Sequence, residues 1–173
     1  MTNAGPPSPS RRHQLLAWAV PRLRRSGELE SVEVERTRLV VVHATARGGL
    51  PTRLVPRFES RFSVVTEVLK GAAGEFPSYV VTPRGADPRR TVVYLHGGGF
   101  VSGIAPFHRR YLARRATALE ARIVLPDYPL TPEHTWRDSH EPIADLVARW
   151  TADSAELVLA GDPAGGGYAL ALA

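Results

Sequence analysis

Two glycine-rich segments carry the residues of this chain that could do chemistry. The first reads His96-Gly97-Gly98-Gly99-Phe100. Three successive glycines let the backbone adopt conformations that other residues avoid, so the N–H groups of Gly97 and Gly98 can point at one substrate oxygen. Acyl transfer needs such donors where negative charge develops on that oxygen. We predict an oxyanion loop with His96 and Gly99 as its scaffold; a flexible loop is the alternative.

The second segment has the shape of a turn that presents a nucleophile. It reads Gly161-Asp162-Pro163-Ala164-Gly165. The pattern Gly-x-Ser-x-Gly holds a serine on a sharp turn between a strand and a helix, where glycines are needed because the two elements pass too closely for larger side chains. We predict that the Ala164 N–H completes the oxyanion hole, and that Gly161, Asp162 and Gly165 are scaffold.

Pro163 stands where that pattern has its serine. Proline has no hydroxyl group, so no acyl-enzyme can form on it. The turn also holds its central residue at a strained positive φ, whereas proline is locked near about −65°. We therefore predict a relaxed turn, an Ala164 N–H turned away, and no intact catalytic residue. Ser102 is a poor substitute because no base is paired with it in the sequence, and we expect Ser154 to be an exposed loop residue.

The hydrophobic pattern indicates which elements position the two segments. Residues 64–69 and 79–82 are β-type runs around a glycine turn, which is typical of an antiparallel hairpin. Short apolar strands then alternate with helices; the strands are 91–95, 123–125 and 157–160, and the helices are 108–119, 138–150 and 164–173. This alternation predicts an α/β fold with a mostly parallel sheet flanked by helices, with chemistry at the carboxyl ends of its strands.

Two of the predicted helices show apolar stripes. The secondary structure of the region before the hairpin is less clearly indicated. The stripes are Tyr111, Leu112, Ala116 and Leu119 in the first helix, and Ile143, Leu146, Val147 and Trp150 in the second. Residues 15–29 suggest a short basic helix interrupted at Pro21. Residues 32–42 fit either a strand or a helix, and 48–56 read as a loop.

Three motifs together resemble one family. They are LHGGGF at 95–100, DYPLTPEH at 127–134 and AGDPAGGG at 160–167. The chain from residue 64 onward is similar to the hormone-sensitive-lipase-like branch of the α/β-hydrolase fold. The resemblance implies a carboxylester hydrolase, of the esterase, lipase or acetylhydrolase kind, that acts on small or medium acyl esters without a cofactor. It also implies that residues 127–134 form a turn that braces the site.

The chain departs from this family in a second way. In the fold an acid and a histidine follow the nucleophile along the chain, but this sequence ends at Ala173. The histidines His96, His108 and His134 all precede the turn. We therefore expect a hydrolase fold truncated after the nucleophile elbow, and an inactive pseudoenzyme. The strand 157–160 would become an edge of the sheet, open to oligomerisation or aggregation.

Composition narrows the remaining options. The chain has 173 residues, no cysteine and a net charge of +5, so disulfides and thiolate chemistry are excluded. No apolar run spans a bilayer, and we expect a cytoplasmic protein. A metal site at His134, Asp138 and His140 is not favoured because nothing completes a ligand set. We expect no nucleic-acid partner and no cofactor, and a small acyl ester as the ligand if there is one.

These observations give three regions and several alternatives. We expect a disordered leader at 1–10, a basic cap-like region at 11–61 and a partial hydrolase domain at 62–173. The alternatives to an inactive relative are a non-catalytic binding module, an active esterase hidden by a sequence error, and a binder of nucleic acid or anionic surfaces. The last would use a group of arginines: Arg11, Arg12, Arg22, Arg24 and Arg25.

Overall fold

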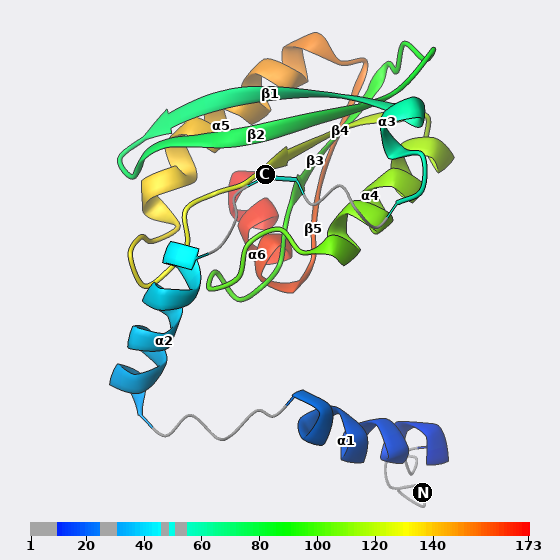
Figure 1. The fold of residues 1–173 in the computed structure, drawn as a ribbon. Helices are drawn as coiled ribbons and strands as arrows, with labels where there is room; N and C mark the ends of the chain where they lie inside the picture. The colour runs from blue at the N-terminus through cyan, green and yellow to red at the C-terminus, as the bar shows by residue number, and fades with distance from the viewer. Residues whose placement is uncertain (1–9, 25–30, 46–48, 51–54) are drawn as a thin grey trace, which may run out of the picture. The chain divides into compact units, whose positions relative to one another are not determined.

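The computed structural model describes residues 10–24, 31–45, 49–50 and 55–173 (Figure 1). The chain divides into two compact units, Met1–Val42 and His43–Ala173. Nearly all of the predicted leader at 1–10 lies outside the described residues, as does most of the predicted loop at 48–56. In the described part of the chain, no helix is long and apolar enough to cross a membrane.

Two helices precede the sheet. Helix α1 (Arg11–Arg24) runs through Pro21, so the predicted interruption there is wrong; proline removes one backbone hydrogen bond, and the helix continues on both sides of it. Helix α2 (Val32–Thr45) settles the open choice between strand and helix. Ser31 Oγ accepts a hydrogen bond from the Val34 N–H at 3.2 Å, and a serine cap of this kind favours a helix start.

Five strands form one mixed sheet. They are β1 (Phe62–Gly71), β2 (Gly74–Pro83), β3 (Arg90–Leu95), β4 (Ala121–Pro126) and β5 (Glu156–Gly161), and their order in the sheet is β1-β2-β4-β3-β5. The predicted hairpin is confirmed, because Gly71 pairs with Gly74 across a two-residue turn. Strand β2 is antiparallel to β4, whereas β3 runs parallel to both β4 and β5.

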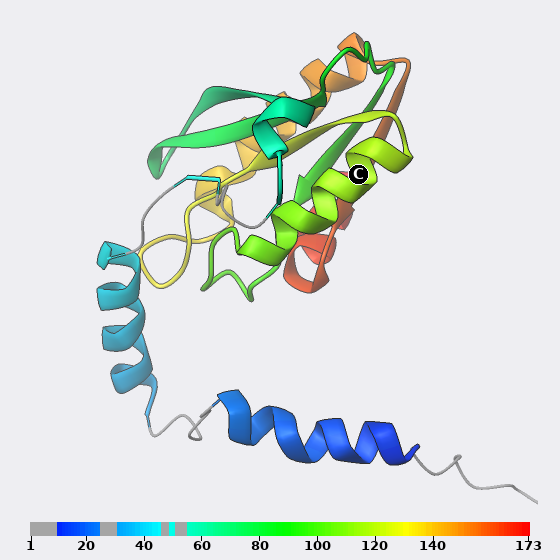
Figure 2. The same ribbon diagram turned by 45° about the vertical axis from the view of Figure 1, so that its right-hand side comes forward.

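Helices cover both faces of this sheet (Figure 2). Helix α4 (Pro106–Ala118) packs on one face, and helices α5 (Arg137–Asp153) and α6 (Pro163–Leu172) pack on the other. The side chains of β3 alternate between two cores: Val92 and Tyr94 belong to the α4 core, and Val93 and Leu95 to the other. Strand β3 is therefore buried on both sides, as a central strand of an α/β sheet should be.

The predicted helix stripes fare differently. In α5, Ile143 and Leu146 are buried, and Val147 and Trp150 pack against them, as predicted. Tyr111 in α4 and Leu119, the C-cap residue that follows it, are 42% and 39% exposed, so half of that stripe is wrong. The buried face of α4 instead carries His108, Arg109, Leu112, Ala113 and Ala116. A hydrophobicity pattern does not reveal this face, because His108 and Arg109 on its core side are polar.

The short helix α3 (Phe58–Arg61) belongs with the sheet. The Phe58 ring lies 5.0 Å from that of Phe62, and both are buried in the α4 core. The Arg109 guanidinium lies over the Phe58 ring at 4.0 Å. The predicted division at 61/62 therefore separates residues that pack together, and the compact unit that contains the sheet begins at His43.

Strand β5 is one edge of the sheet, and Val158 on it is 36% exposed. A charged side chain on an edge strand opposes pairing with another chain. We expect Val158→Lys to reduce self-association, measured by sedimentation velocity at increasing protein concentration. Ala148→Lys, which adds the same charge to an exposed position of α5, should leave association unchanged. An equal effect of both variants would assign the change to net charge and not to the edge.

Candidate functional site

The two glycine-rich segments lie side by side in the structure. Strands β3 and β5 are parallel neighbours, and Leu95 pairs with Gly161. His96 and Asp162 therefore leave adjacent strands at the same edge of the sheet. Strand β3 also separates β4 from β5, so the chain moves first to one side of β3 and then to the other. Ligand sites in open α/β sheets form at such a reversal of strand order.

The turn between β5 and α6 is as tight as its glycines indicate. A Cβ on Gly165 would lie 1.9 Å from the Leu95 carbonyl oxygen, and a Cβ on Gly161 would lie 2.4 Å from the Gly165 carbonyl carbon. Neither position has room for another residue unless the backbone moves. The close approach predicted from the sequence is confirmed at both glycines.

Asp162 joins the two segments. Its Oδ1 accepts hydrogen bonds from the Gly97 N–H at 2.6 Å and the Tyr94 hydroxyl at 2.9 Å. Its Oδ2 lies 3.1 Å from His108 Nε2. Burial alone would raise the pKa of Asp162, but the hydrogen bonds from Tyr94, His108 and Gly97 outweigh it and lower that pKa. Asp162 is thus a charged bridge between the glycine loop, α4 and α6.

This bridge corrects one predicted oxyanion donor. The Gly97 N–H already donates to Asp162, so the assignment of Gly97 is wrong. Gly98 and Gly99 have positive φ angles of 118° and 64°, both residues are exposed, and within the described residues neither N–H donates a hydrogen bond. The loop therefore offers Gly98 and Gly99 as free donors, with Gly97 as the anchor.

Pro163 is the first residue of α6 and is exposed. Proline suits this position because its fixed φ is helical and its missing N–H has no partner there. Ala164 follows in the first turn, where N–H groups have no intrahelical acceptor, so its role as a donor stays a prediction. Asp162 is the N-cap residue of α6 but makes no side-chain cap, because its carboxylate is turned towards the glycine loop.

His96 is a buried part of the scaffold. Its ring stacks on that of Tyr128, with centroids 4.1 Å apart, and its Nδ1 lies 2.9 Å from the Gly97 carbonyl oxygen. A carbonyl only accepts, so Nδ1 carries the proton. Burial lowers the pKa of His96 to about 4, which keeps the ring neutral at pH 7. Burial also raises the pKa of Asp127, 4.0 Å away, to about 6.

The turn at 127–134 holds the glycine loop at both ends. The Tyr128 hydroxyl donates to the His96 carbonyl oxygen. At the other end, the Phe100 carbonyl oxygen accepts from the Thr131 N–H at 2.8 Å and from the Thr131 hydroxyl at 3.2 Å. The bracing role that the family resemblance implies for this turn is visible in these contacts.

His108 was missed as a site residue by the sequence analysis. Its Nδ1 accepts a hydrogen bond from the Ala105 N–H at 2.8 Å, so Nε2 carries the proton and donates to Asp162. Both ring nitrogens are occupied, which leaves His108 without a lone pair for proton abstraction. Tyr94 was also missed. A hydroxyl near the carboxyl end of β3, two residues before His96, is the signal that could have found it.

The other candidates lie apart from these contacts. Ser154 donates to the Thr91 hydroxyl at 2.7 Å, beyond the amino end of β5, and Ser102 is exposed. Asp138 accepts hydrogen bonds from the N–H and hydroxyl of Thr135. Within the described ranges, no three His, Cys, Asp or Glu side chains are grouped to hold a metal ion.

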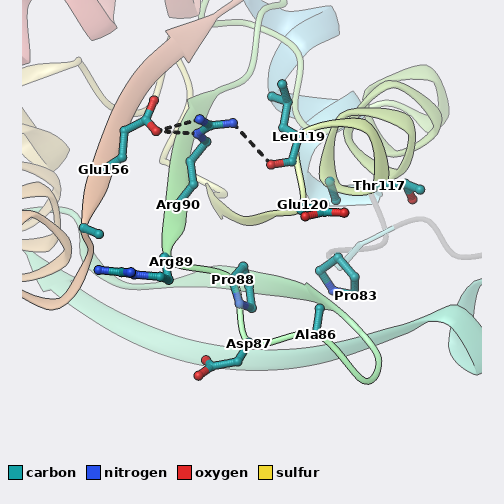
Figure 3. A pocket seen from close by; sticks show the side chains of 12 residues that line it. Pro83, Ala86, Asp87, Pro88, Arg89, Arg90, Thr117, Leu119, Glu120 and Glu156 are labelled. Atoms are coloured by element: carbon teal, nitrogen blue, oxygen red, sulfur yellow. Dashed lines mark hydrogen bonds and ion pairs between the residues drawn. The ribbon is translucent and has the colours of Figure 1, made fainter.

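A groove of about 830 Å³ lies at the opposite end of the sheet (Figure 3). It is lined by residues at the amino ends of β3 and β5 and the carboxyl end of α4. Arg90 there forms an ion pair with Glu156 at 2.6 Å and donates to the Leu119 carbonyl oxygen at 3.3 Å. The length of β3 separates this groove from the glycine loop. The candidate site therefore lies at the carboxyl ends of the strands, and the groove lies at their amino ends.

Comparisons with known proteins agree with this arrangement. A family model described as the α/β-hydrolase fold matches residues 92–173. The esterase LipU of Mycobacterium tuberculosis is 31% identical over 137 residues, which cover 77% of this chain and 43% of LipU. The carboxylesterase/phospholipase LipF of the same organism is 40% identical over 88 residues, 49% of this chain and 23% of LipF.

A solved structure of an esterase has a similar fold. An esterase from Pyrobaculum calidifontis superposes with a TM-score of 0.60 at 27% sequence identity, over 96% of this chain and 52% of that one. The chain thus spans about half, or less, of the length of the proteins it matches.

The two glycine positions in and after the turn allow a matched test. Gly165→Ala should destabilise the fold by about 1–3 kcal/mol or more, because the new Cβ overlaps the Leu95 carbonyl. Gly167→Ala, on the same helix with nothing within 4 Å of its Cβ, should stabilise it by about 0.5–1 kcal/mol. Urea unfolding measures both; equal losses would contradict the close approach.

Asp162→Asn tests the bridge. Loss of the charged acceptor should lower the free energy of unfolding by about 1.5–3 kcal/mol at pH 7, while Asp145→Asn, at an exposed position of α5, should have no effect. Because the folded-state pKa of Asp162 is lowered, its contribution is present above the unfolded pKa of about 3.9 and is lost as pH falls through the folded value. Denaturation at pH 7 and pH 3 should show the difference between the two variants shrink.

Proposed function

We propose that this chain, which has the α/β-hydrolase fold and motifs similar to those of the hormone-sensitive-lipase-like branch, is a non-hydrolytic relative of the carboxylester hydrolases. In this proposal the chain binds the carbonyl oxygen of a small acyl ester at backbone N–H groups and does not cleave the ester. The observation that carries the proposal is Pro163 at the first position of α6.

The missing nucleophile supports the absence of turnover. Ester hydrolysis in this family proceeds through a covalent acyl-enzyme on a serine hydroxyl, and the Pro163 side chain has only carbon atoms. The two histidines nearest to the turn do not replace the missing chemistry. His96 is buried and neutral, and both nitrogens of His108 are occupied. A water molecule would therefore find no general base on either ring.

The remaining backbone donors support the binding role. Gly98 and Gly99 present N–H groups with positive φ angles at the exposed end of the loop. Ala164 lies in the uncapped first turn of α6. Donors of this kind bind a carbonyl or carboxylate oxygen without any side-chain charge. Two relatives that match this chain are named as an esterase and a carboxylesterase/phospholipase, which supports an acyl ester as the ligand class.

The region before the sheet is part of the proposal. Helices α1 and α2 fall within the stretch that the sequence analysis assigns to a cap-like region. We propose that this stretch, residues 11–61, has such a role. The edge strand β5 is the proposed route of self-association.

Hydrolysis assays test the absence of turnover. The chain should hydrolyse p-nitrophenyl acetate and butyrate no faster than Pro163→Ala does, because neither residue has a nucleophile. A fluorophosphonate probe should add no mass to the intact protein. Turnover that survives in Pro163→Ala but disappears in Ser102→Ala would contradict the proposal and assign the nucleophile to Ser102.

Amide NMR shifts test the binding role in the same protein. Titration with ethyl butyrate should shift the Gly98 and Gly99 amide signals, because in this proposal their N–H groups bind the ester oxygen. A shift of the Ala164 signal would add that N–H to the site. The Gly97 amide is an internal control, since it donates to Asp162 and should move least. Shifts spread evenly over the loop, or none at millimolar ester, would count against an ester site.

A further inference from the structure

His43 connects the end of α2 to two segments of the candidate site. Its Nδ1 lies 2.8 Å from the Glu133 Oε2, and its Nε2 lies 2.8 Å from the Val101 carbonyl oxygen. Its side chain is only 17% exposed. Val101 directly follows the glycine loop, and Glu133 lies in the turn that braces that loop. His43 thus contacts both segments at the rim of the site.

Both partners of this ring are hydrogen-bond acceptors. A backbone carbonyl never donates, and an ionised carboxylate only accepts. The two short contacts are satisfied together only when both ring nitrogens carry protons, that is, by the imidazolium form. A neutral ring keeps one contact and turns a lone pair towards the other acceptor. We propose that His43 is a protonation-dependent clasp that fastens the end of α2 to the glycine loop and its bracing turn.

The clasp acts where the loop closes on itself. The Val101 N–H donates to the Gly98 carbonyl oxygen at 3.1 Å, and the Ser102 N–H donates to the same oxygen at 3.1 Å. The Thr131 N–H holds Phe100 from the other side. When His43 releases the Val101 carbonyl, the segment that closes on Gly98 loses a hydrogen bond to a distant part of the chain.

Few other charges act on this ring. Glu133 faces it from the bracing turn, and His134 acts on Glu133. Asp127 of the same turn lies beside Gly103 and His96. The loop from Gly98 to Ala105 has no ionisable side chain. On α2 itself, Glu35 and Arg38 pair with each other. The charge of His43 is therefore balanced chiefly by Glu133.

The pKa of His43 agrees in sign with the geometry. Burial by itself lowers this pKa, but the hydrogen bonds to Val101 and Glu133 outweigh burial and raise it. The contact with His43 in turn lowers the pKa of Glu133. A raised folded-state pKa means that the clasp contributes fully below the unfolded value of about 6.5 and is lost as pH rises through the folded value.

NMR of the full chain tests the clasp directly. We expect the His43 ring signal to titrate above about 6.5, the value of a free histidine. Glu133→Gln should move that midpoint downward, whereas Glu75→Gln, which removes a glutamate from the distant hairpin, should not. A His43 midpoint at or below about 6.5 in the unmodified chain would overturn the proposal, whether or not any variant folds.

Hydrogen exchange gives the structural readout. After correction for intrinsic rates, protection of the Val101 and Ser102 amides should fall about fivefold as pH rises through the His43 midpoint, which corresponds to the loss of one hydrogen bond. In His43→Asn, protection should be low at every pH, with circular dichroism confirming the fold. Protection that does not change across the midpoint in the unmodified chain would contradict the clasp. The inference does not depend on whether the site binds or cleaves esters.

Discussion

The Asp162 carboxylate fixes the geometry on which the rest of the site depends. It lies between two parallel strands that each end in a tight turn, and it accepts hydrogen bonds from the Gly97 N–H, the Tyr94 hydroxyl and His108. Gly97 is held in this way, and the two glycines after it have positive φ angles at the surface. Asp162 occupies a position that the motif Gly-x-Ser-x-Gly leaves unspecified, yet it connects the glycine loop, α4 and α6.

Glycine acts in two distinct ways around this bridge. At Gly161 and Gly165 the constraint is space, since a side chain there would overlap the backbone of β3 or α6. At Gly98 and Gly99 the constraint is the φ angle, which other residues adopt at a cost. Gly97 belongs to the first kind, because a Cβ on it would lie 2.5 Å from the Asp162 carboxylate. Three adjacent glycines thus serve a packing role and a conformational role.

The sequence was sufficient for the strands, the hairpin and the two site segments, because period-two runs and glycine turns have strong local signatures. It overstated the parallel part of the sheet, since β2 pairs antiparallel with both β1 and β4. It was insufficient where side chains act over long sequence separations. His108 and Tyr94 reach Asp162 from 54 and 68 residues away, and nothing local marks those pairs. The assignment of Gly97 as a donor failed for the same reason, since its acceptor is Asp162. The buried face of α4 was misjudged because Arg109 packs on Phe58 and counts as polar in any periodicity.

The position of β3 between two cores limits which changes in sequence the fold can accept. Its side chains alternate between two cores, and its last residues set the register that brings His96 beside Asp162. One inserted or deleted residue in β3 would exchange the two cores and displace the loop. Proline at position 163, in contrast, fits the start of α6 without disturbing either strand. The fold therefore tolerates a substitution at position 163 far better than any change in the length of β3.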